Sequence, residues 1–369
     1  MTEPIDIAVV GLGKMGLSHF AIVNAHPLAR TMACEGQGFV ADALARNVAA
    51  PVHRDYDAML ASERLDAVLI ATPSRLHAPM VRAALERGLH VFCEKPFCLD
   101  WREAEALAAL AEERGVVAQV GYHYRYVGAF REMRRLVEAG AIGRVTHVLA
   151  EAYGPVVLRP KRATWRSAKG EGGGCLYDYA AHPLNLLNWL FGPPDRVAGS
   201  ALVEVFSEGV DDQVMATLHW ADGPTAQLSV NWSDESHRKM STKVTLIGTN
   251  GRIQADRQEC QAYLRAPVDG LPDYGAGWTV RYTTELTDEV GFYLRGEEYS
   301  AQVDDFVAAV AAGEGAAREN GFRSAAQTDR TMAMILENAR TGAAATADGA
   351  DVPPPAPPAR RGWLGRLRA

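Results

Sequence analysis

An apolar segment near the start of the chain, residues 5–10, runs directly into the turn Gly11-Leu12-Gly13-Lys14-Met15-Gly16, which a helical pattern follows. The glycine spacing has a physical meaning. Gly11 permits a tight turn, Gly13 lets the backbone approach a pyrophosphate, and Gly16 lets the helix pack closely on the strand. The helix N-terminus then attracts the phosphates. The segment predicts a dinucleotide site rather than the alternative, a plain strand-to-helix turn. The expected contacts at the turn are Gly11, Gly13, Lys14, Met15 and Gly16.

The acid that such a site requires follows the second predicted strand, residues 28–34. Glu35 stands 19 residues after Gly16. A carboxylate there can accept hydrogen bonds from the adenosine ribose and repel a 2′-phosphate. Because no arginine follows until Arg46, the sequence favours NAD over NADP. Asp42 is a rival for this role, and either acid can instead be a solvated loop charge.

Strands and helices keep alternating up to about residue 122. Residues 66–72 form an apolar strand ended by Pro73, and Ser74 can cap a helix that stops at Gly88. Asp100 and Glu103 resemble a capping box, and residues 116–120 form a further strand. This periodicity predicts an α/β unit with a parallel sheet over residues 1–122.

One strand of this unit ends in a charged tetrapeptide. The run His90-Val91-Phe92 leads into Cys93-Glu94-Lys95-Pro96. Ligands of parallel α/β sheets bind at the carboxyl ends of the strands, so Lys95 is expected to project into a binding crevice.

Composition narrows the class of protein. A chain of 369 residues, 48% hydrophobic and 22% charged, suits two globular domains. Its net charge of −7 argues against a nucleic-acid partner. We expect no integral membrane segment, since no apolar run is long enough to span a bilayer. Five scattered cysteines without a Cys-x-x-Cys pair indicate reduced thiols, a cytoplasmic protein and no metal site.

The second half has a different pattern, with longer alternating strands from about residue 144. Residues 225–232 place apolar side chains on one face, and Asn250-Gly251 signals a hairpin. Apolar residues at helical spacing over 299–310 predict a packed helix, and another is expected over 322–340. We predict a second α/β unit over residues 123–342, whose one-sided sheet can stack on helices or on another subunit.

Residues 343–369 are expected to be an Ala- and Pro-rich linker followed by a basic tail. Residues 353–358 hold five prolines in six positions. The basic tail can contact an anionic surface or a partner. The alternative is a disordered, solubilising end.

A second group of chemically active residues follows a run of three glycines, residues 172–174. If the segment is helical throughout, Asp178, His182 and Asn185 share one face. Pro183 fits best in a first helical turn, so the regular helix can instead begin near Ala181, and the alignment of Asp178 with His182 is then not assured. Taken alone, His182 fits an ordinary core or surface histidine.

These separated segments together resemble the Gfo/Idh/MocA oxidoreductases, over about residues 4–342. The matching segments are Gly11 to Gly16; Ala71-Thr72-Pro73 with His77; Glu94-Lys95-Pro96; Gly121 through Arg125; Trp165-Arg166; and the glycine run with Asp178 and His182. The resemblance implies a Rossmann domain followed by an α/β domain with a large, mostly antiparallel open sheet. It further implies that this sheet forms a homodimer or homotetramer interface.

The resemblance also implies roles for individual residues. It places Lys95, Asp178 and His182 at the nicotinamide end of the cleft as catalytic residues. The further cofactor contacts expected are Glu35, Thr72, Pro73, His77, Glu94 and Lys95. The candidate substrate contacts are Arg125, Tyr153, Trp165, Arg166 and Asn185. Ala180 and Asn185 depart from the glycine and aspartate common in the family, which bears on the substrate.

The chemistry of these residue types agrees with alcohol oxidation. His182 has a pKa suited to accepting a hydroxyl proton near neutrality. Asp178 would support that base, and Lys95 would stabilise the developing alkoxide. The hypothesis is an NAD(P)-dependent oxidoreductase acting on a secondary alcohol or ketone of a sugar, cyclitol or nucleotide sugar. The alternatives are an NAD-using glycosidase without net redox change and a non-enzymatic dinucleotide sensor.

Overall fold

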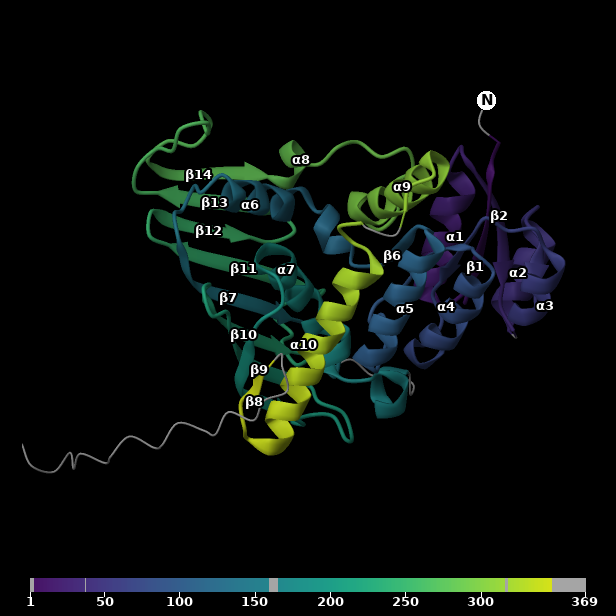
Figure 1. Cartoon of the computed structure of the whole chain (residues 1–369), viewed down its shortest axis with the longest axis horizontal. Coiled ribbons are helices and arrows are strands. Elements are labelled where there is room, and N and C mark those ends of the chain that lie inside the picture. Colours follow the sequence, from purple (N-terminus) through teal and green to yellow (C-terminus); the bar gives the residue numbers. More distant parts are fainter. Residues whose placement is uncertain (1–2, 37, 159–164, 316–317, 347–369) are drawn as a thin grey trace, which may run out of the picture.

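The computed structural model describes residues 3–36, 38–158, 165–315 and 318–346. Within them the chain forms two units side by side, each built on one sheet (Figure 1). Helix α10 (Phe322–Thr341) runs between the two units and packs on α5 (Trp101–Arg114) of the first and on β8 (Arg196–Val203) of the second. The predicted two-sheet α/β architecture is confirmed.

The first sheet has the strand order β3-β2-β1-β4-β5-β6, and all its neighbours are parallel. This is the order of a doubly wound dinucleotide-binding sheet. Its strands are β1 (Ile5–Val10), β2 (Ala29–Cys34), β3 (Val52–His53), β4 (Ala67–Ile70), β5 (His90–Cys93) and β6 (Ala118–Val120). Its other helices are α1 (Lys14–Ala25), α2 (Phe39–Asn47), α3 (Tyr56–Ser62) and α4 (His77–Glu86).

A helix from late in the chain covers one face of this first sheet. Helix α9 (Glu297–Ala312) packs Val303 and Phe306 against the apolar cluster that contains Val9 and Phe92. The rings of Phe306 and Phe92 meet edge to face, with centroids 5.8 Å apart. The apolar stripe predicted over residues 299–310 is therefore core. That core belongs to the first sheet, although the helix lies within residues 123–342.

The second sheet has nine strands in the order β14-β13-β12-β11-β7-β10-β9-β8-β15. All neighbours are antiparallel except β7 and β10, which run parallel. The hairpin predicted at Asn250-Gly251 joins β11 to β12. The remaining strands are β7 (Val145–Tyr153), β9 (Gln213–His219), β10 (Thr225–Asn231), β11 (Ser241–Gly248), β12 (Gly251–Ala255), β13 (Glu259–Leu264), β14 (Gly277–Tyr282) and β15 (Ala345–Thr346). The helices α6 (Gly128–Glu138), α7 (Ala181–Phe191) and α8 (Thr283–Leu286) complete this unit.

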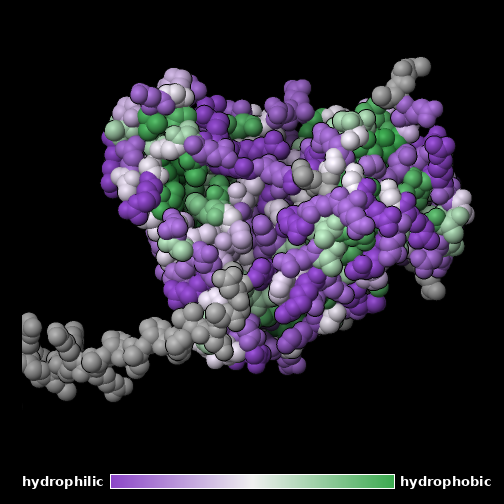
Figure 2. Space-filling model, in the orientation of Figure 1, coloured by the Kyte–Doolittle hydropathy of each residue, from purple (hydrophilic) through white to green (hydrophobic). Residues whose placement is uncertain are grey.

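Alternating burial along β7, β9 and β10 gives the second sheet one packed face and one open face, as the sequence pattern predicts. On the view in Figure 2 an apolar patch lies over β13 and β14. Tyr263, Trp278 and Val280 on these strands are exposed.

Some local predictions need correction. The side chain of Ser74 makes no capping hydrogen bond, because residues 74–76 form a 3₁₀ turn that precedes α4. Asp100 does cap α5, accepting from the Arg102 N–H at 2.9 Å. Ala345 and Thr346 pair with β8, so the sheet extends into the range predicted as linker. The predicted proline-rich stretch, residues 353–358, and the predicted basic tail, residues 360–368, lie outside the described residues. No helix within the described ranges is long and apolar enough to cross a membrane.

Candidate active site

A cavity of about 500 Å³ lies where the glycine turn, the end of β5 and the start of α7 meet. Of the residues predicted for the site, Lys14, Met15, Glu94, Lys95, Arg166, Asp178 and His182 line it. The structure therefore brings together side chains from both units and from segments more than 160 residues apart.

The glycine turn has the shape that a pyrophosphate requires. A Cβ on Gly16 would lie 1.7 Å from the Gly11 carbonyl oxygen, and Gly11 itself has a φ of +86°. Both positions therefore need glycine to close the turn. A Cβ on Gly13 would meet nothing within 4 Å, and no side chain caps the N-terminus of α1. The turn thus leaves open space above Gly13 and uncapped helix N–H groups, which fit a bound phosphate.

Glu35 follows β2 and lies beside this turn. Its Oε2 accepts a hydrogen bond from the Leu12 N–H at 2.7 Å. The rival acid Asp42 lies on α2 and pairs with Arg54 instead. Glu35 is therefore the acid that contacts the glycine turn, while its predicted contact with ribose stays a prediction.

His77 braces the turns that follow β4 and β5. Its Nδ1 lies 2.9 Å from the Pro96 carbonyl oxygen, and its Nε2 lies 3.0 Å from the Thr72 carbonyl oxygen. The ring is buried, which lowers the pKa of His77. Neither His77 nor Thr72 nor Pro73 is on the wall of the cavity, so His77 positions the Thr72-Pro73 turn from behind it.

Glu94 is held as a carboxylate by a histidine that the sequence reading missed. Oε1 of Glu94 lies 2.7 Å from Nε2 of His19 on α1. Burial alone would raise the pKa of Glu94, but the hydrogen bond from His19 and the nearby charge of Lys95 leave it lowered. A Cβ on Gly121 would come within 2.9 Å of this carboxylate, which explains the glycine.

The ammonium of Lys95 is fixed by Asp178. Nζ donates to the Asp178 carbonyl oxygen at 2.8 Å and to Oδ1 at 3.0 Å. The other carboxylate oxygen of Asp178 accepts from Nε of Arg166 at 2.7 Å. Burial opposes ionisation of Asp178, but Lys95 and Arg166 lower its pKa to about 2. One nearly buried carboxylate thus holds two cations.

The backbone around Asp178 differs from a continuous α-helix. Residues 176–180 form a π-helical turn, and the regular helix α7 begins at Ala181. This agrees with the alternative that Pro183 suggested, and the extra residue in the turn breaks the expected alignment of Asp178 with His182. The glycine run has a steric cause as well, because a Cβ on Gly174 would lie 2.4 Å from Oδ1 of Asp211.

The role predicted for Asp178 toward His182 accordingly needs correction. Asp178 bonds to Lys95 and Arg166, and Nδ1 of His182 has no hydrogen-bond partner among the described residues. The imidazole instead lies against the rings of His123 and Tyr124, each with its centroid 5.0 Å away. Burial, aided by the charge of Lys95, puts the pKa of His182 far below its usual value. His182 is therefore a neutral imidazole with an unused nitrogen.

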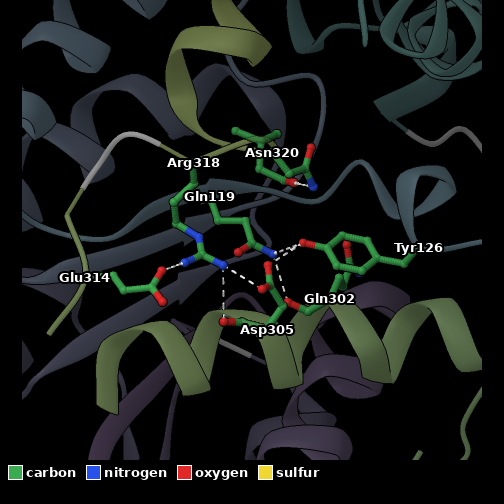
Figure 3. Close-up of polar contacts among 8 residues, drawn as sticks. Gln119, Tyr126, Gln302, Asp305, Glu314, Arg318 and Asn320 are labelled. Carbon is green, nitrogen blue, oxygen red and sulfur yellow. Dashed lines mark hydrogen bonds and ion pairs between the residues drawn. The ribbon is translucent and has the colours of Figure 1, made fainter. Parts of the chain in front are cut away.

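The turn that presents His123 and Tyr124, residues 123–126, is anchored from outside the cavity (Figure 3). The Tyr126 hydroxyl donates to Asp305 at 2.6 Å and accepts from Gln119 at 3.1 Å. Asp305 also pairs with Arg318. Burial lowers the pKa of His123 to about 3. The network joins the turn to β6, α9 and the segment before α10, so elements packed on the first sheet fix the position of His123.

Four of the predicted substrate contacts lie outside the cavity. Arg125 is buried and donates to Asn185 at 2.7 Å, and burial lowers the pKa of Arg125 to about 9. Asn185 donates in turn to Thr328 of α10, so this pair joins helices. Tyr153 lies on the open face of the second sheet, where its hydroxyl bonds to Ser229. Trp165 does not line the cavity, but its ring stacks on the guanidinium of Arg166 at 4.6 Å.

The structure adds cavity residues that the sequence reading did not single out. They include His123, Tyr124, Lys239, Met240, Arg257, Arg295 and Tyr299. His123 lies within the Gly121–Arg125 segment that carried the resemblance, so that segment was a usable signal. Neither Arg257 nor Arg295 belongs to a sequence motif, and only the tertiary fold brings them to the cavity.

Similarity to known proteins extends over most of the chain. Residues 5–122 match the model of the oxidoreductase family with an NAD-binding Rossmann fold, and residues 130–254 match that of the GFO/IDH/MocA C-terminal domain. The inositol 2-dehydrogenase of Rhizobium meliloti is 26% identical over 85% of this chain and 96% of its own length. The 2,7-anhydro-N-acetylneuraminate hydratase of Mediterraneibacter gnavus is 28% identical over 74% of this chain and 72% of its own.

Solved structures show the same fold. GenD2 from gentamicin A biosynthesis, in complex with NAD, superimposes with a TM-score of 0.76 at 27% identity, covering 94% of this chain and 97% of that one. A levoglucosan dehydrogenase with NADH and levoglucosan gives 0.82 at 23% identity over 95% and 100% of the two chains.

Proposed function

This chain belongs to the GFO/IDH/MocA family of NAD(P)-binding oxidoreductases, and on that premise we propose that it transfers a hydride between NAD and a secondary alcohol or ketone of a sugar, cyclitol or nucleotide sugar. The observation that carries the proposal is one cavity in which the open glycine turn, a fixed ammonium and a neutral buried imidazole meet. These are the groups that alcohol oxidation needs.

His182 serves as the base. The pKa of His182 is lowered from the near-neutral value expected from the sequence, so the ring is neutral across the whole neutral range, and we propose that this cavity-lining imidazole accepts the hydroxyl proton of a substrate. Lys95 donates to the substrate oxygen as negative charge develops there. Asp178, itself paired with Arg166, fixes the ammonium so that little reorganisation is needed. The nicotinamide, when bound, supplies the hydride acceptor.

NAD rather than NADP is the proposed cofactor. Glu35 follows β2 and accepts a hydrogen bond from Leu12 of the glycine turn, a position that supports a contact with the adenosine ribose, where its negative charge would repel a 2′-phosphate. The pyrophosphate would be held by the glycine turn, at Gly11, Gly13, Lys14, Met15 and Gly16. Glu94 and Lys95 line the same cavity and would lie at the nicotinamide end of the cofactor.

The open face of the nine-stranded sheet, with its exposed apolar side chains, suits a homodimer or homotetramer interface. The described cysteines are all buried free thiols, which fits a cytoplasmic protein.

A second candidate is a reaction without net redox change. The similarity to a 2,7-anhydro-N-acetylneuraminate hydratase favours it, because that relative's name describes a hydration. The same residues would serve both reactions, so the products decide between them. A transformed glycoside without accumulated NADH would support this second function.

The test is a screen of sugars, inositols and sugar nucleotides with NAD and NADP, followed by nicotinamide absorbance. Replacing the base, His182→Asn, should lower kcat about 10²- to 10⁴-fold while NADH binding persists. Lys95→Met should also lower kcat. The matched controls are His219→Asn and Lys243→Met, which lie on the second sheet away from the cavity. Full activity of both site variants would refute the assigned roles.

The pH profile adds an independent check. Since the pKa of His182 lies far below 6.5, kcat/KM should stay level as the pH falls through 6.5. An acid limb with an apparent pKa at or above 6.5, absent from His182→Asn, would contradict the neutral, buried base.

A further inference from the structure

A second cavity of about 920 Å³ adjoins the first, and four residues line both of them. These four, Lys239, Met240, Arg257 and Arg295, define what we call the junction. The inner cavity holds His182, and the outer cavity is lined by Tyr282 and Tyr293 among others. The two cavities are therefore parts of one cleft, and a ligand seated against His182 can extend past the junction.

The inner cavity carries a charge opposite to that of the chain. The chain as a whole has a net charge of −7. Along the inner cavity, however, lysines and arginines outnumber carboxylates by seven to two. Such a concentration of one sign inside a cleft attracts ligands of the other sign.

Several of these cations already have partners. Asp178 holds Lys95 and Arg166, and Arg257 pairs with the buried carboxylate of Glu298. Arg295 and Lys239 have no carboxylate within ion-pair distance in the described part of the chain. Among the described residues, Lys14 of the glycine turn also has no ion pair, so the positive charge without a described counterion lies at the junction and at the glycine turn rather than beside His182.

The backbone of Arg295 has an unusual conformation. Its φ of 70° makes it the one residue other than glycine with a positive φ in the described ranges. Such strain persists where the surrounding structure enforces it, and it clusters at functional sites. The next residue is also constrained, because a Cβ on Gly296 would lie 2.4 Å from the Glu298 carboxylate. The turn thus sets Arg295 beside the Glu298–Arg257 pair.

A stack of rings connects Arg295 to the proposed base. Its guanidinium lies 5.3 Å from the Tyr299 ring centroid, Tyr299 stacks on His123 at 4.4 Å, and His123 lies 5.0 Å from His182. Arg295 is therefore held against the wall of the cleft, separated from His182 by two aromatic layers. A group bound by Arg295 would belong to the same ligand as the hydroxyl at His182.

We propose that the substrate carries an oxyanion, a phosphate or a carboxylate, which binds at the junction against Arg295 and Lys239. Guanidinium groups bind both oxyanions through paired hydrogen bonds. The inference rests on the proposed function, because it assigns the substrate class of the same cavity. It excludes simple neutral polyols as the preferred substrates.

Two sources supply this chemistry. A sugar joined to a nucleoside would place its pyrophosphate at the junction and its base in the outer cavity, where Tyr282 and Tyr293, 51% and 65% exposed, offer stacking faces. A sugar acid or sugar phosphate would fill only the inner cavity and the junction.

The experiment measures binding to the full-length protein saturated with NADH, by calorimetry. The probes are methyl glucoside, glucuronate, glucose 1-phosphate and UDP-glucose. At least one anionic probe should bind tenfold or more tightly than methyl glucoside. Arg295→Gln and, separately, Lys239→Gln should lower that preference about tenfold. Arg340→Gln, which removes an exposed arginine paired with Glu337 on α10, should leave it unchanged. The stronger of UDP-glucose and the two smaller anions identifies the source.

The outcomes separate this inference from the proposed function. Equal binding of neutral and anionic probes, or an unchanged preference in both folded variants, overturns the oxyanion site. Turnover of neutral sugars alone also overturns it and leaves the oxidoreductase intact. Anion preference that depends on Arg295, without turnover of any probe, supports the oxyanion site and counts against the proposed reaction.

Discussion

Asp178 is the carboxylate on which the geometry of Lys95 depends, and its replacement by asparagine tests that directly. Asp178→Asn keeps the size of the side chain and removes its charge. The two cations at 3.0 Å and 2.7 Å would then face each other without a counterion, in a place where Asp178 is 4% exposed. Breaking a buried ion pair in this way costs about 3–5 kcal/mol of stability.

The pKa gives a second measure of the same interaction. The pKa of Asp178 falls from 3.8 to about 2 on folding, which corresponds to about 2 kcal/mol at neutral pH. Because the folded pKa is lowered, this stability is fully present above pH 3.8 and is lost as the pH falls toward 2. The variant should exceed this value, since it also leaves Lys95 and Arg166 without their counterion.

Thermal and urea unfolding of the full chain at pH 7 measure the effect. A loss of 3–5 kcal/mol corresponds to a fall in Tm of about 6–10 °C at ~2 °C per kcal/mol. Activity should fall about 10²-fold, because an asparagine amide offers one acceptor oxygen instead of two and no charge, so it cannot hold both Lys95 and Arg166 in place. Glu112→Gln makes the same chemical change at an exposed pair with Arg323 and should cost less than about 1 kcal/mol.

A double variant tests whether the loss of stability has an electrostatic cause. Adding Arg166→Gln to Asp178→Asn removes one of the stranded cations and should restore part of the lost stability. The electrostatic account is wrong if Asp178→Asn melts within 1 °C of the wild type. It is also wrong if the double variant is less stable than Asp178→Asn alone.

Three further predictions follow from the glycine turn and from two other acids. Gly16→Ala should lower the Tm, because its methyl group would lie 1.7 Å from a carbonyl oxygen. Gly13→Ala should leave the Tm of the cofactor-free protein unchanged and weaken NADH binding, measured by fluorescence titration, at least tenfold. Equal Tm values for the two variants would contradict this. Glu35→Ala should reduce the NAD-over-NADP preference in Kd about tenfold or more, and an unchanged ratio would remove Glu35 from that role. Burial raises the pKa of Asp329 well above its usual value, and Oδ2 of this side chain accepts a hydrogen bond from the Cys98 N–H. Because the folded pKa is raised, the stability that Asp329 contributes is lost as the pH rises through the folded pKa. The Tm of Asp329→Asn relative to wild type should therefore rise from pH 5 to pH 8.5, and a flat difference would argue against a neutral Asp329.

The parts of the fold and site that follow from local sequence were predictable. The glycine turn, the second-strand acid and the strand that precedes Lys95 each depend on a few adjacent residues with a fixed physical role. Their positions in the structure agree with the sequence reading, as do the hairpin at Asn250 and the two late helices.

The parts that depend on distant contacts were not predictable from pattern. The spacing of Asp178 and His182 suggested a pair, but the π-helical turn directs Asp178 to Lys95 and Arg166 instead. Arg125 and Asn185 have the polarity of substrate contacts, yet they meet each other between helices. The spacing of residues along a chain predicts which face of a helix or strand they share, but it does not predict which residues pack against that face.

The packing of α9 on the first sheet determines how this protein can be divided. A polypeptide ending at residue 122 would contain every strand of the nucleotide-binding sheet, but it would expose Val9 and Phe92 to water. The nucleotide-binding half is therefore discontinuous in sequence, and its transplantation into another protein must include residues 297–312. Exchange of the second unit between relatives must likewise cut the chain on both sides of α9, at three points rather than one.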